Sequence, residues 1–306
     1  MNPLVSVADG KVTRMDEAQV SARVLAALEV LPADPTDLTN MLLSETDRDA
    51  LLLGAIKPET GLLARHISAM LDSGRESFWR ERIGSILRGG GASFLPAHCG
   101  NFPRALLQVW DAPPFLFCQG ALARQDSRSL AIVGSRRASF QSQAAAFEIA
   151  QELATAGWEI VSGLAIGVDT QAHLGALQGG RTTAVLGSGL DKVLPSENLA
   201  LARDVAESGA LVSQFPPGSP GTSTTFLRRN RTIAGLSTAS LVIEAEARSG
   251  SRHELECAIS YDRAALLWEP VMARMSWARD LVESGTANFV SSVDDIVAVV
   301  ESRARQ

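Results

Sequence analysis

The sequence predicts an α/β protein: an extended Rossmann-type parallel sheet with helices on both faces, preceded by a small helical N-terminal domain. Short apolar segments alternate with helical segments of ten or more residues from about residue 130 onward, which is typical of parallel βαβ units. Glycine, serine and arginine cluster after these apolar segments, at the edge where parallel sheets bind ligands. Gly89-Gly90-Gly91 is costly to order inside an element, so we expect a helical domain over residues 1–90 and a Rossmann-type domain over residues 91–306.

The N-terminal domain is predicted to be helical because its apolar residues recur at helical spacing. Val20, Val24 and Leu28 mark the first such stretch, and prolines at positions 32 and 35 interrupt the pattern after it. The predicted helices are 16–30, 37–53 and 62–70.

The second domain is predicted to contain buried strands, since its apolar runs are short and end in glycine or serine. Ser139 is the expected N-cap of the helix that follows the first strand. The predicted strands are 130–133, 158–162, 183–186, 210–213, 241–244 and 264–268, and the predicted helices are 139–156, 170–177, 196–207 and 292–303.

Two arginine-bearing windows contain no acidic residue, although the chain carries a formal net charge of -6. One spans 208–243 and holds Arg228-Arg229-Asn230-Arg231; the other spans 127–147 and holds Arg136-Arg137. The planar guanidinium fork matches phosphate oxygens, and the turn at Gly134-Ser135 leads to a helix N-terminus whose free N–H groups attract anions. Because binding responds to local potential, the overall acidity does not exclude nucleic acid.

Several classes of function lack their sequence signals. The G-x-G-x-x-G and P-loop patterns are missing, so we predict no nucleotide cofactor. The three cysteines, at positions 99, 118 and 257, have no spacing suited to zinc, and we predict no metal site. The N-terminus does not resemble a signal peptide, and no apolar run is long enough to span a membrane, so we expect a cytoplasmic protein.

Residues 131–248 resemble the DprA/Smf family of bacterial DNA-processing proteins. The motifs that carry the resemblance are VGSRRAS (133–139), VSGLAIGVDTQAH (161–173), VLGSGLDKVLP (185–195), SQFPPG (213–218), FLRRNRTIAGLS (226–237) and EAEARSGS (244–251). The resemblance implies a protein that binds single-stranded DNA without base specificity, usually as a homodimer. In the family such proteins protect incoming DNA in natural transformation and hand the strand to the RecA recombinase. The family is not known as an enzyme.

The resemblance and the arginine windows together give a set of candidate DNA-contacting residues. The resemblance implies contacts from Gly134, Ser135, Arg136, Ser162, Gly163, Gly187, Ser188, Arg229, Asn230 and Arg231. The basic windows and the glycine-serine clusters add Arg137, Arg228, Ser249 and Gly250.

The chain departs from the family pattern after Ser249-Gly250-Ser251. The family continues there with an apolar pair, Thr-Ala and a basic residue, whereas this chain has Arg252-His253-Glu254-Leu255-Glu256. Glu269-Pro270 replaces a Pro-Gly turn, and a later Gly-Thr-Asn segment is missing. An alternative is therefore a nucleotide-binding or nucleotide-hydrolysing protein similar to the LOG-like phosphoribohydrolases, with Glu254 and Glu256 at the site; in another interpretation these acids only pair with nearby arginines.

Overall fold

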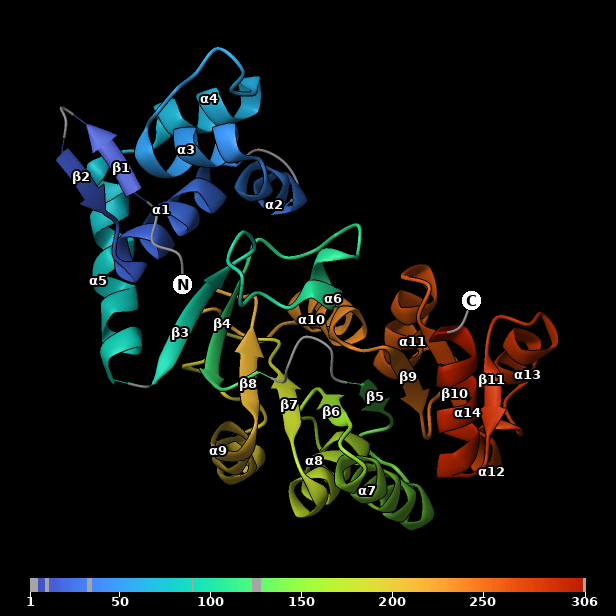
Figure 1. Cartoon of the computed structure of the whole chain (residues 1–306). Coiled ribbons are helices and arrows are strands. Elements are labelled where there is room, and N and C mark those ends of the chain that lie inside the picture. Colours follow the sequence, from blue (N-terminus) through green and yellow to red (C-terminus); the bar gives the residue numbers. More distant parts are fainter. Residues whose placement is uncertain (1–4, 9–10, 32–34, 90, 123–127, 305–306) are drawn as a thin grey trace. The chain divides into compact units, whose positions relative to one another are not determined.

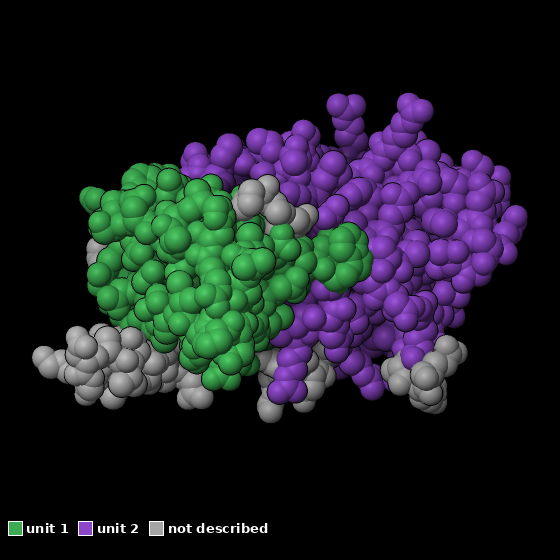
Figure 2. Space-filling model, turned by 90° about the horizontal axis from the view of Figure 1, so that it is seen from above, with its two compact units in different colours: residues 1–103, 110–118 green, residues 104–109, 119–306 purple. Residues whose placement is uncertain are grey.

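A computed structural model describes residues 5–8, 11–31, 35–89, 91–122 and 128–304. The chain divides into two compact units, one formed by Met1–Pro103 and Trp110–Cys118, the other by Arg104–Val109 and Gln119–Gln306 (Figure 2). Gly90, in the middle of the expected boundary, lies outside the described residues, and the division into residues 1–90 and 91–306 stays a prediction.

The first unit is mainly helical. The prediction of one helix over 37–53 is wrong, because the helix is interrupted at Ser44. The Ser44 side chain accepts a hydrogen bond from the Asp47 N–H at 3.5 Å and caps a second helix. Its helices are α1 Glu17–Val30, α2 Pro35–Leu43, α3 Glu45–Leu53, α4 Leu62–Met70 and α5 Ser73–Gly89. Its strands are the antiparallel pair β1 Val5–Ala8 and β2 Lys11–Arg14, then β3 Ala92–Pro96 and most of β4 Phe115–Gly120.

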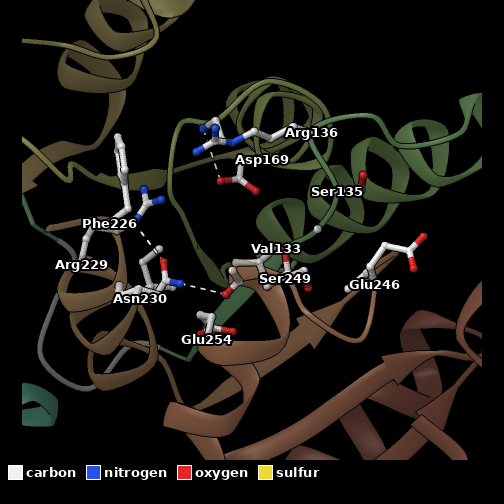
Figure 3. A pocket seen from close by; sticks show the side chains of 17 residues that line it. Val133, Ser135, Arg136, Asp169, Phe226, Arg229, Asn230, Glu246, Ser249 and Glu254 are labelled. Atoms are coloured by element: carbon white, nitrogen blue, oxygen red, sulfur yellow. Dashed lines mark hydrogen bonds between the residues drawn. The ribbon is translucent and has the colours of Figure 1, made fainter. Parts of the chain in front are cut away.

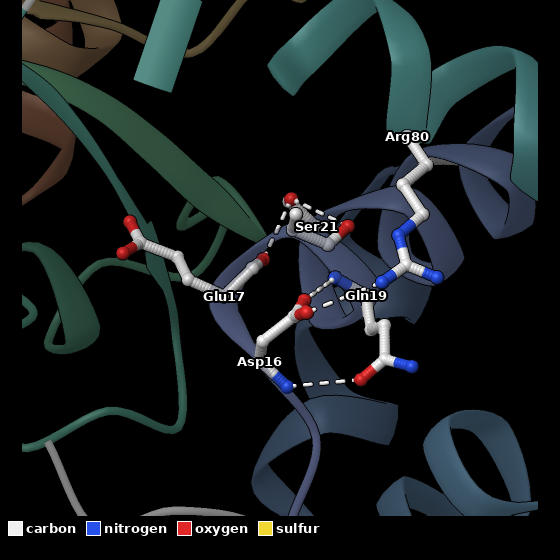
Figure 4. Close-up of polar contacts among 6 residues, drawn as sticks. Asp16, Glu17, Gln19, Ser21 and Arg80 are labelled. Carbon is white, nitrogen blue, oxygen red and sulfur yellow. Dashed lines mark hydrogen bonds and ion pairs between the residues drawn. The ribbon is translucent and has the colours of Figure 1, made fainter. Parts of the chain in front are cut away.

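Local hydrogen bonds fix the start of α1, where the sequence predicted it (Figure 4). The Gln19 N–H donates to the Asp16 carboxylate at 2.7 Å, and the Asp16 N–H donates to the Gln19 side chain at 3.0 Å. This reciprocal capping box satisfies two N–H groups that the helix itself leaves unpaired. Arg80 of α5 reaches the same carboxylate at 3.2 Å, which ties α5 to the start of α1.

Within its described residues, the second unit contains seven parallel strands in the order β11-β10-β9-β5-β6-β7-β8 (Figure 1). From β5 the chain winds outward to β8; it then returns to place β9 on the other side of β5 and winds outward again to β11. The fold class expected from the sequence is confirmed. The strands are β5 Ser129–Val133, β6 Glu159–Ser162, β7 Thr182–Val185, β8 Ala210–Ser213, β9 Ala239–Val242, β10 Ala264–Trp268 and β11 Asn288–Val290.

Helices cover both faces of this sheet. Leu130 and Ile132 pack into a buried cluster with α7, α8 and α14. Val133 points to the opposite face because side chains alternate along a strand, and there α10 lies against β5, β6 and β7. The helices are α6 Arg104–Leu107, α7 Phe140–Thr155, α8 Val168–Gly179, a 3₁₀ turn Ser196–Asn198, α9 Leu199–Ser208, α10 Ser223–Leu236, α11 Gly250–Ser260, α12 Glu269–Met272, α13 Ser276–Glu283 and α14 Val293–Ala304.

None of the helices in the described ranges has both the length and the apolar character that crossing a membrane requires.

Candidate functional site

A cavity of about 290 Å³ opens at the carboxyl ends of β5 and β9 (Figure 3). These neighbouring strands are where the winding direction reverses, which is the place where open α/β sheets bind ligands. Three segments far apart in the sequence, with the start of α8, form its walls. The lining residues are Val133, Gly134, Ser135, Arg136, Ala165, Asp169, Phe226, Leu227, Arg229, Asn230, Ile233, Ala245, Glu246, Ser249, Gly250, Ser251 and Glu254.

The turn after β5 brings the start of α8 close to the sheet. A Cβ atom on Gly134 would lie 2.5 Å from a methyl group of Val168, so the position requires glycine. The Ser135 N–H donates to the Glu244 carbonyl at 2.8 Å, and its hydroxyl accepts from the Arg137 N–H at 3.0 Å. The turn therefore holds a fixed shape, and both Arg136 and Arg137 are exposed beside it.

Arg229 is buried, with 6% of its surface exposed. Its guanidinium donates to the carbonyls of Gly163 and Val185, and its Nε donates to the Asn230 side chain at 3.2 Å. A Cβ on Gly163 would lie 2.1 Å from this guanidinium. Burial lowers the pKa of Arg229, and the charge of Asp169 raises it. Arg229 thus links the ends of β6 and β7 to α10.

Asn230 extends this link to α11, since its amide nitrogen donates to the Gly250 carbonyl at 2.9 Å. Both ends of the Asn230 side chain are engaged, one by Arg229 and one by Gly250 (Figure 3). Ser249 caps the N-terminus of α11 by accepting from the Arg252 N–H at 3.2 Å.

Two buried carboxyl groups line the cavity. Asp169 accepts from the Ala165 N–H at 3.3 Å; burial raises its pKa and Arg229 lowers it. Glu254 accepts from the Ser240 hydroxyl at 2.7 Å through Oε1, while its Oε2 has no hydrogen-bond partner among the described residues. Burial raises the pKa of Glu254 to about 8.

Glu256, the other acid considered from the sequence, does not line the cavity. It is exposed and pairs with Arg252 at 2.9 Å, as one interpretation of the sequence expected. Residues two apart on a helix face different directions, so of these two acids α11 directs only Glu254 toward the cavity.

The remaining candidate residues fall into a supporting group and an exposed group. Ser162 is buried and donates to the Ile132 carbonyl at 2.6 Å. Gly187 gives Phe226 room, because a Cβ there would lie 2.4 Å from the ring, and the Ser188 hydroxyl donates to the Lys192 carbonyl at 2.5 Å. Arg228 and Arg231 are exposed on α10, three residues apart and therefore neighbours on its surface.

Sequence reasoning missed Phe226, which contributes to one wall of the cavity. The guanidinium carbons of Arg136 and Arg229 lie 5.7 and 5.8 Å from its ring centroid. The signal was available, since Phe226 stands three residues before Arg229 and so shares its helix face, but no helix had been predicted there. No three His, Cys, Asp or Glu side chains gather to hold a metal ion in the part of the chain that the structure describes.

Comparisons with known proteins agree with this architecture. The family model described as DNA recombination-mediator protein A matches residues 93–301. Protein Smf of Escherichia coli is 35% identical over 81% of this chain and 66% of its own length, and the DNA processing protein DprA of Streptococcus pneumoniae is 36% identical over 65% of this chain and 71% of its own length. The chain spans 44% of the Synechocystis Protein Smf.

Solved structures give the same result. DNA processing protein A from Streptococcus pneumoniae superposes with a TM-score of 0.65 and 27% identity, covering 92% of this chain and 94% of that one. The Helicobacter pylori protein, studied for its single-stranded DNA binding mode, gives a TM-score of 0.62 and 27% identity over 69% of this chain and 96% of that one. Since the family model matches more than half of its residues, the chain belongs to the DNA recombination-mediator protein A family, that of the DprA and Smf proteins.

Proposed function

We propose that this protein binds single-stranded DNA, chiefly through its phosphates, and acts in DNA processing. The observation that carries the proposal is the set of exposed arginines beside the cavity: Arg136 and Arg137 in the turn after β5, and Arg228 and Arg231 on α10, which forms one wall. Phosphate contacts carry no base information, so strands of any sequence bind. The related Helicobacter pylori protein, described by its single-stranded DNA binding mode, supports this ligand.

The finer parts of the proposal follow from the family resemblance. We propose that the protein acts as a homodimer in the cytoplasm, that it passes the strand to RecA, and that it performs no chemical step of its own. The residues we propose to touch phosphate are the four exposed arginines, with the N-terminus of α11 at Ser249 and Gly250 as a further anion site. Five further candidate residues support the shape of the site rather than touch phosphate: Ser162, Gly163, Gly187, Ser188 and Arg229.

A second candidate function is nucleotide binding or hydrolysis, and one observation favours it. Glu254 is a buried carboxyl group at a sheet-edge cavity, and burial raises its pKa to about 8. A carboxylic acid that stays protonated near neutral pH can act as a general acid. Glu256 no longer supports this candidate, because it lies outside the cavity lining.

The test is fluorescence anisotropy with labelled oligo-dT at several salt concentrations, beside a panel of free nucleotides. If four arginines neutralise four phosphates, the affinity should fall about fifty-fold between about 50 and about 200 mM salt. Arg231→Ala should weaken binding by about 1–3 kcal/mol, since it removes a charge-assisted contact. Arg203→Ala, which removes an exposed arginine from α9, is the matched control and should bind normally.

Both variants are first checked by circular dichroism. An affinity that does not change with salt would contradict the DNA proposal. Tight binding of a free nucleotide with no binding of oligo-dT would favour the second candidate instead.

A further inference from the structure

The Oε2 atom of Glu254 has no hydrogen-bond partner within the described ranges, although 99% of the residue's surface is buried. Its other oxygen is engaged by Ser240 of β9. A buried polar atom without a partner costs free energy, and among the described residues no other side chain that lines the cavity has such an atom. The Oε2 atom belongs to a side chain that lines the cavity, so its partner can come from whatever the cavity binds.

The neighbouring side chains are committed elsewhere. Asn230 uses its oxygen for Arg229 and its nitrogen for Gly250. Arg229 donates to two backbone carbonyls and to Asn230. Asp169, the other buried acid at this cavity, is an acceptor when ionised and offers Glu254 no donor.

A phosphate group is a poor occupant of this part of the cavity. It would meet the carboxyl groups of Asp169 and Glu254, while Arg229, the buried cation nearby, already bonds to carbonyl oxygens. Phosphates therefore favour the four exposed arginines, of which Arg136 lines the cavity far along the chain from Glu254. A base of the same strand suits the cavity better, because Phe226 and the Arg136 guanidinium, 5.7 Å from the Phe226 ring centroid, both line it and are flat groups of the kind that stack on bases, and a volume of about 290 Å³ is enough for one base.

We infer that Glu254 makes this cavity select bases that carry an exocyclic amino group (cytosine, adenine or guanine) over thymine. The inference rests on the proposed binding of single-stranded DNA and adds a base preference to it. The family pattern has threonine at this position, so the preference is a property of this chain's own residue.

The base preference follows from the Oε2 atom of Glu254, since its Oε1 atom already accepts from Ser240. An exocyclic amino group projects from the ring and can donate to Oε2, as carboxylates do when they read cytosine. When Glu254 is ionised, thymine is the weaker partner, because the one ring N–H that it offers is flanked by two carbonyl oxygens that the carboxylate repels. A site built to bond a polar group rejects the analogue that lacks it. Burial raises the pKa of Glu254 to about 8, so the carboxylate that accepts from an amino group predominates above that pH, whereas the protonated acid donates to a carbonyl oxygen instead.

The experiment compares oligo-dC, oligo-dT and oligo-dU of equal length by anisotropy at pH 9, where Glu254 is ionised, and at one salt concentration. The wild-type protein should bind oligo-dC on the order of ten-fold more tightly than the other two, the gain expected from one hydrogen bond to a charged group. Oligo-dU controls for the methyl group of thymine. Glu254→Leu should bring the three affinities together.

Glu256→Leu is the matched control, because it removes an exposed carboxylate from the same helix and should keep the preference. Glu254→Thr, with the family's residue, replaces Glu254→Leu if the latter does not fold, and should also abolish the preference. Equal wild-type affinities for oligo-dC, oligo-dT and oligo-dU would overturn the inference and leave the proposed function standing. If none of the three oligonucleotides binds, the proposed function itself fails.

Discussion

Arg229 and Arg231 are two positions apart, yet their environments are opposite. Arg229 is buried and bonds to the carbonyls of Gly163 and Val185, whereas Arg231 is exposed on the surface of α10. The sequence identified both as candidate phosphate ligands because the run RRNR shows charge but not burial. Once the helix is known, its periodicity explains why alternate arginines face opposite directions.

Glu254 should make the stability of the protein depend on pH. Its pKa is about 8 in the folded protein against an ordinary value of 4.5, so between these values the folded state binds more protons than the unfolded state. The free energy of unfolding should therefore fall as pH rises from about 4.5 to about 8, and level off above that.

Thermal melts of the wild type and of Glu254→Gln at pH 5 and pH 9 measure this effect. The variant cannot ionise at this position, so its melting temperature should exceed that of the wild type by more at pH 9 than at pH 5. The same difference at both pH values would show that Glu254 does not titrate in this range.

At the scale of elements, six of the seven strands described in the second unit could be predicted, whereas β11 and α10 could not. Buried parallel strands such as Ser129–Val133 are continuous apolar runs that end in glycine or serine, which a sequence shows directly. The predicted strand 241–244 begins two residues later than the observed strand Ala239–Val242, because Ser240 interrupts the apolar run. In α10 three arginines and an asparagine hide the apolar face, so tertiary packing against β5, β6 and β7 decides its structure.

The capping box at the start of α10 should stabilise the helix that carries Arg228 and Arg231. The Thr222 hydroxyl accepts from the Thr225 N–H at 3.1 Å, and the Thr225 hydroxyl accepts from the Thr222 N–H at 2.8 Å. Thr222→Ala should lower the free energy of unfolding by about 1 kcal/mol, measured by urea denaturation. Thr224→Ala, an exposed neighbour outside the capping box, should change it by less than about 0.5 kcal/mol, and equal losses in both variants would contradict a capping role.

At the scale of the whole molecule, the sequence located the candidate site because each predicted strand ends in a turn at one edge of the sheet. It could not show which turns enclose a cavity. The sequence does not show that β5 and β9 are neighbours, because this contact joins distant parts of the chain. The hydrogen bond between Ser129 and Thr238, for example, links residues 109 positions apart. Asp169, at the start of α8, also lines the cavity at this edge of the sheet.

We expect the protein to be a homodimer in solution, so that two cavities serve one DNA strand. α8 contacts α9, and each carries an exposed leucine, Leu174 and Leu199, which is compatible with an apolar interface on this side of the sheet. Sedimentation equilibrium at micromolar concentration should give about twice the chain mass of 32.4 kDa. A mass near that of one chain would contradict the dimer.

The position of β9 beside β5 also determines when the binding site can first exist. Most of the residues that line the cavity come from the turn after β5, from α10 and from the segment between β9 and Glu254. The cavity is therefore complete only when the last of these segments has folded into place. A nascent chain on the ribosome has already exposed the arginines after β5 long before α11 has been synthesised. Such a chain can attract an anion but has no cavity to hold a base, so the finished site appears only after synthesis has passed residue 254.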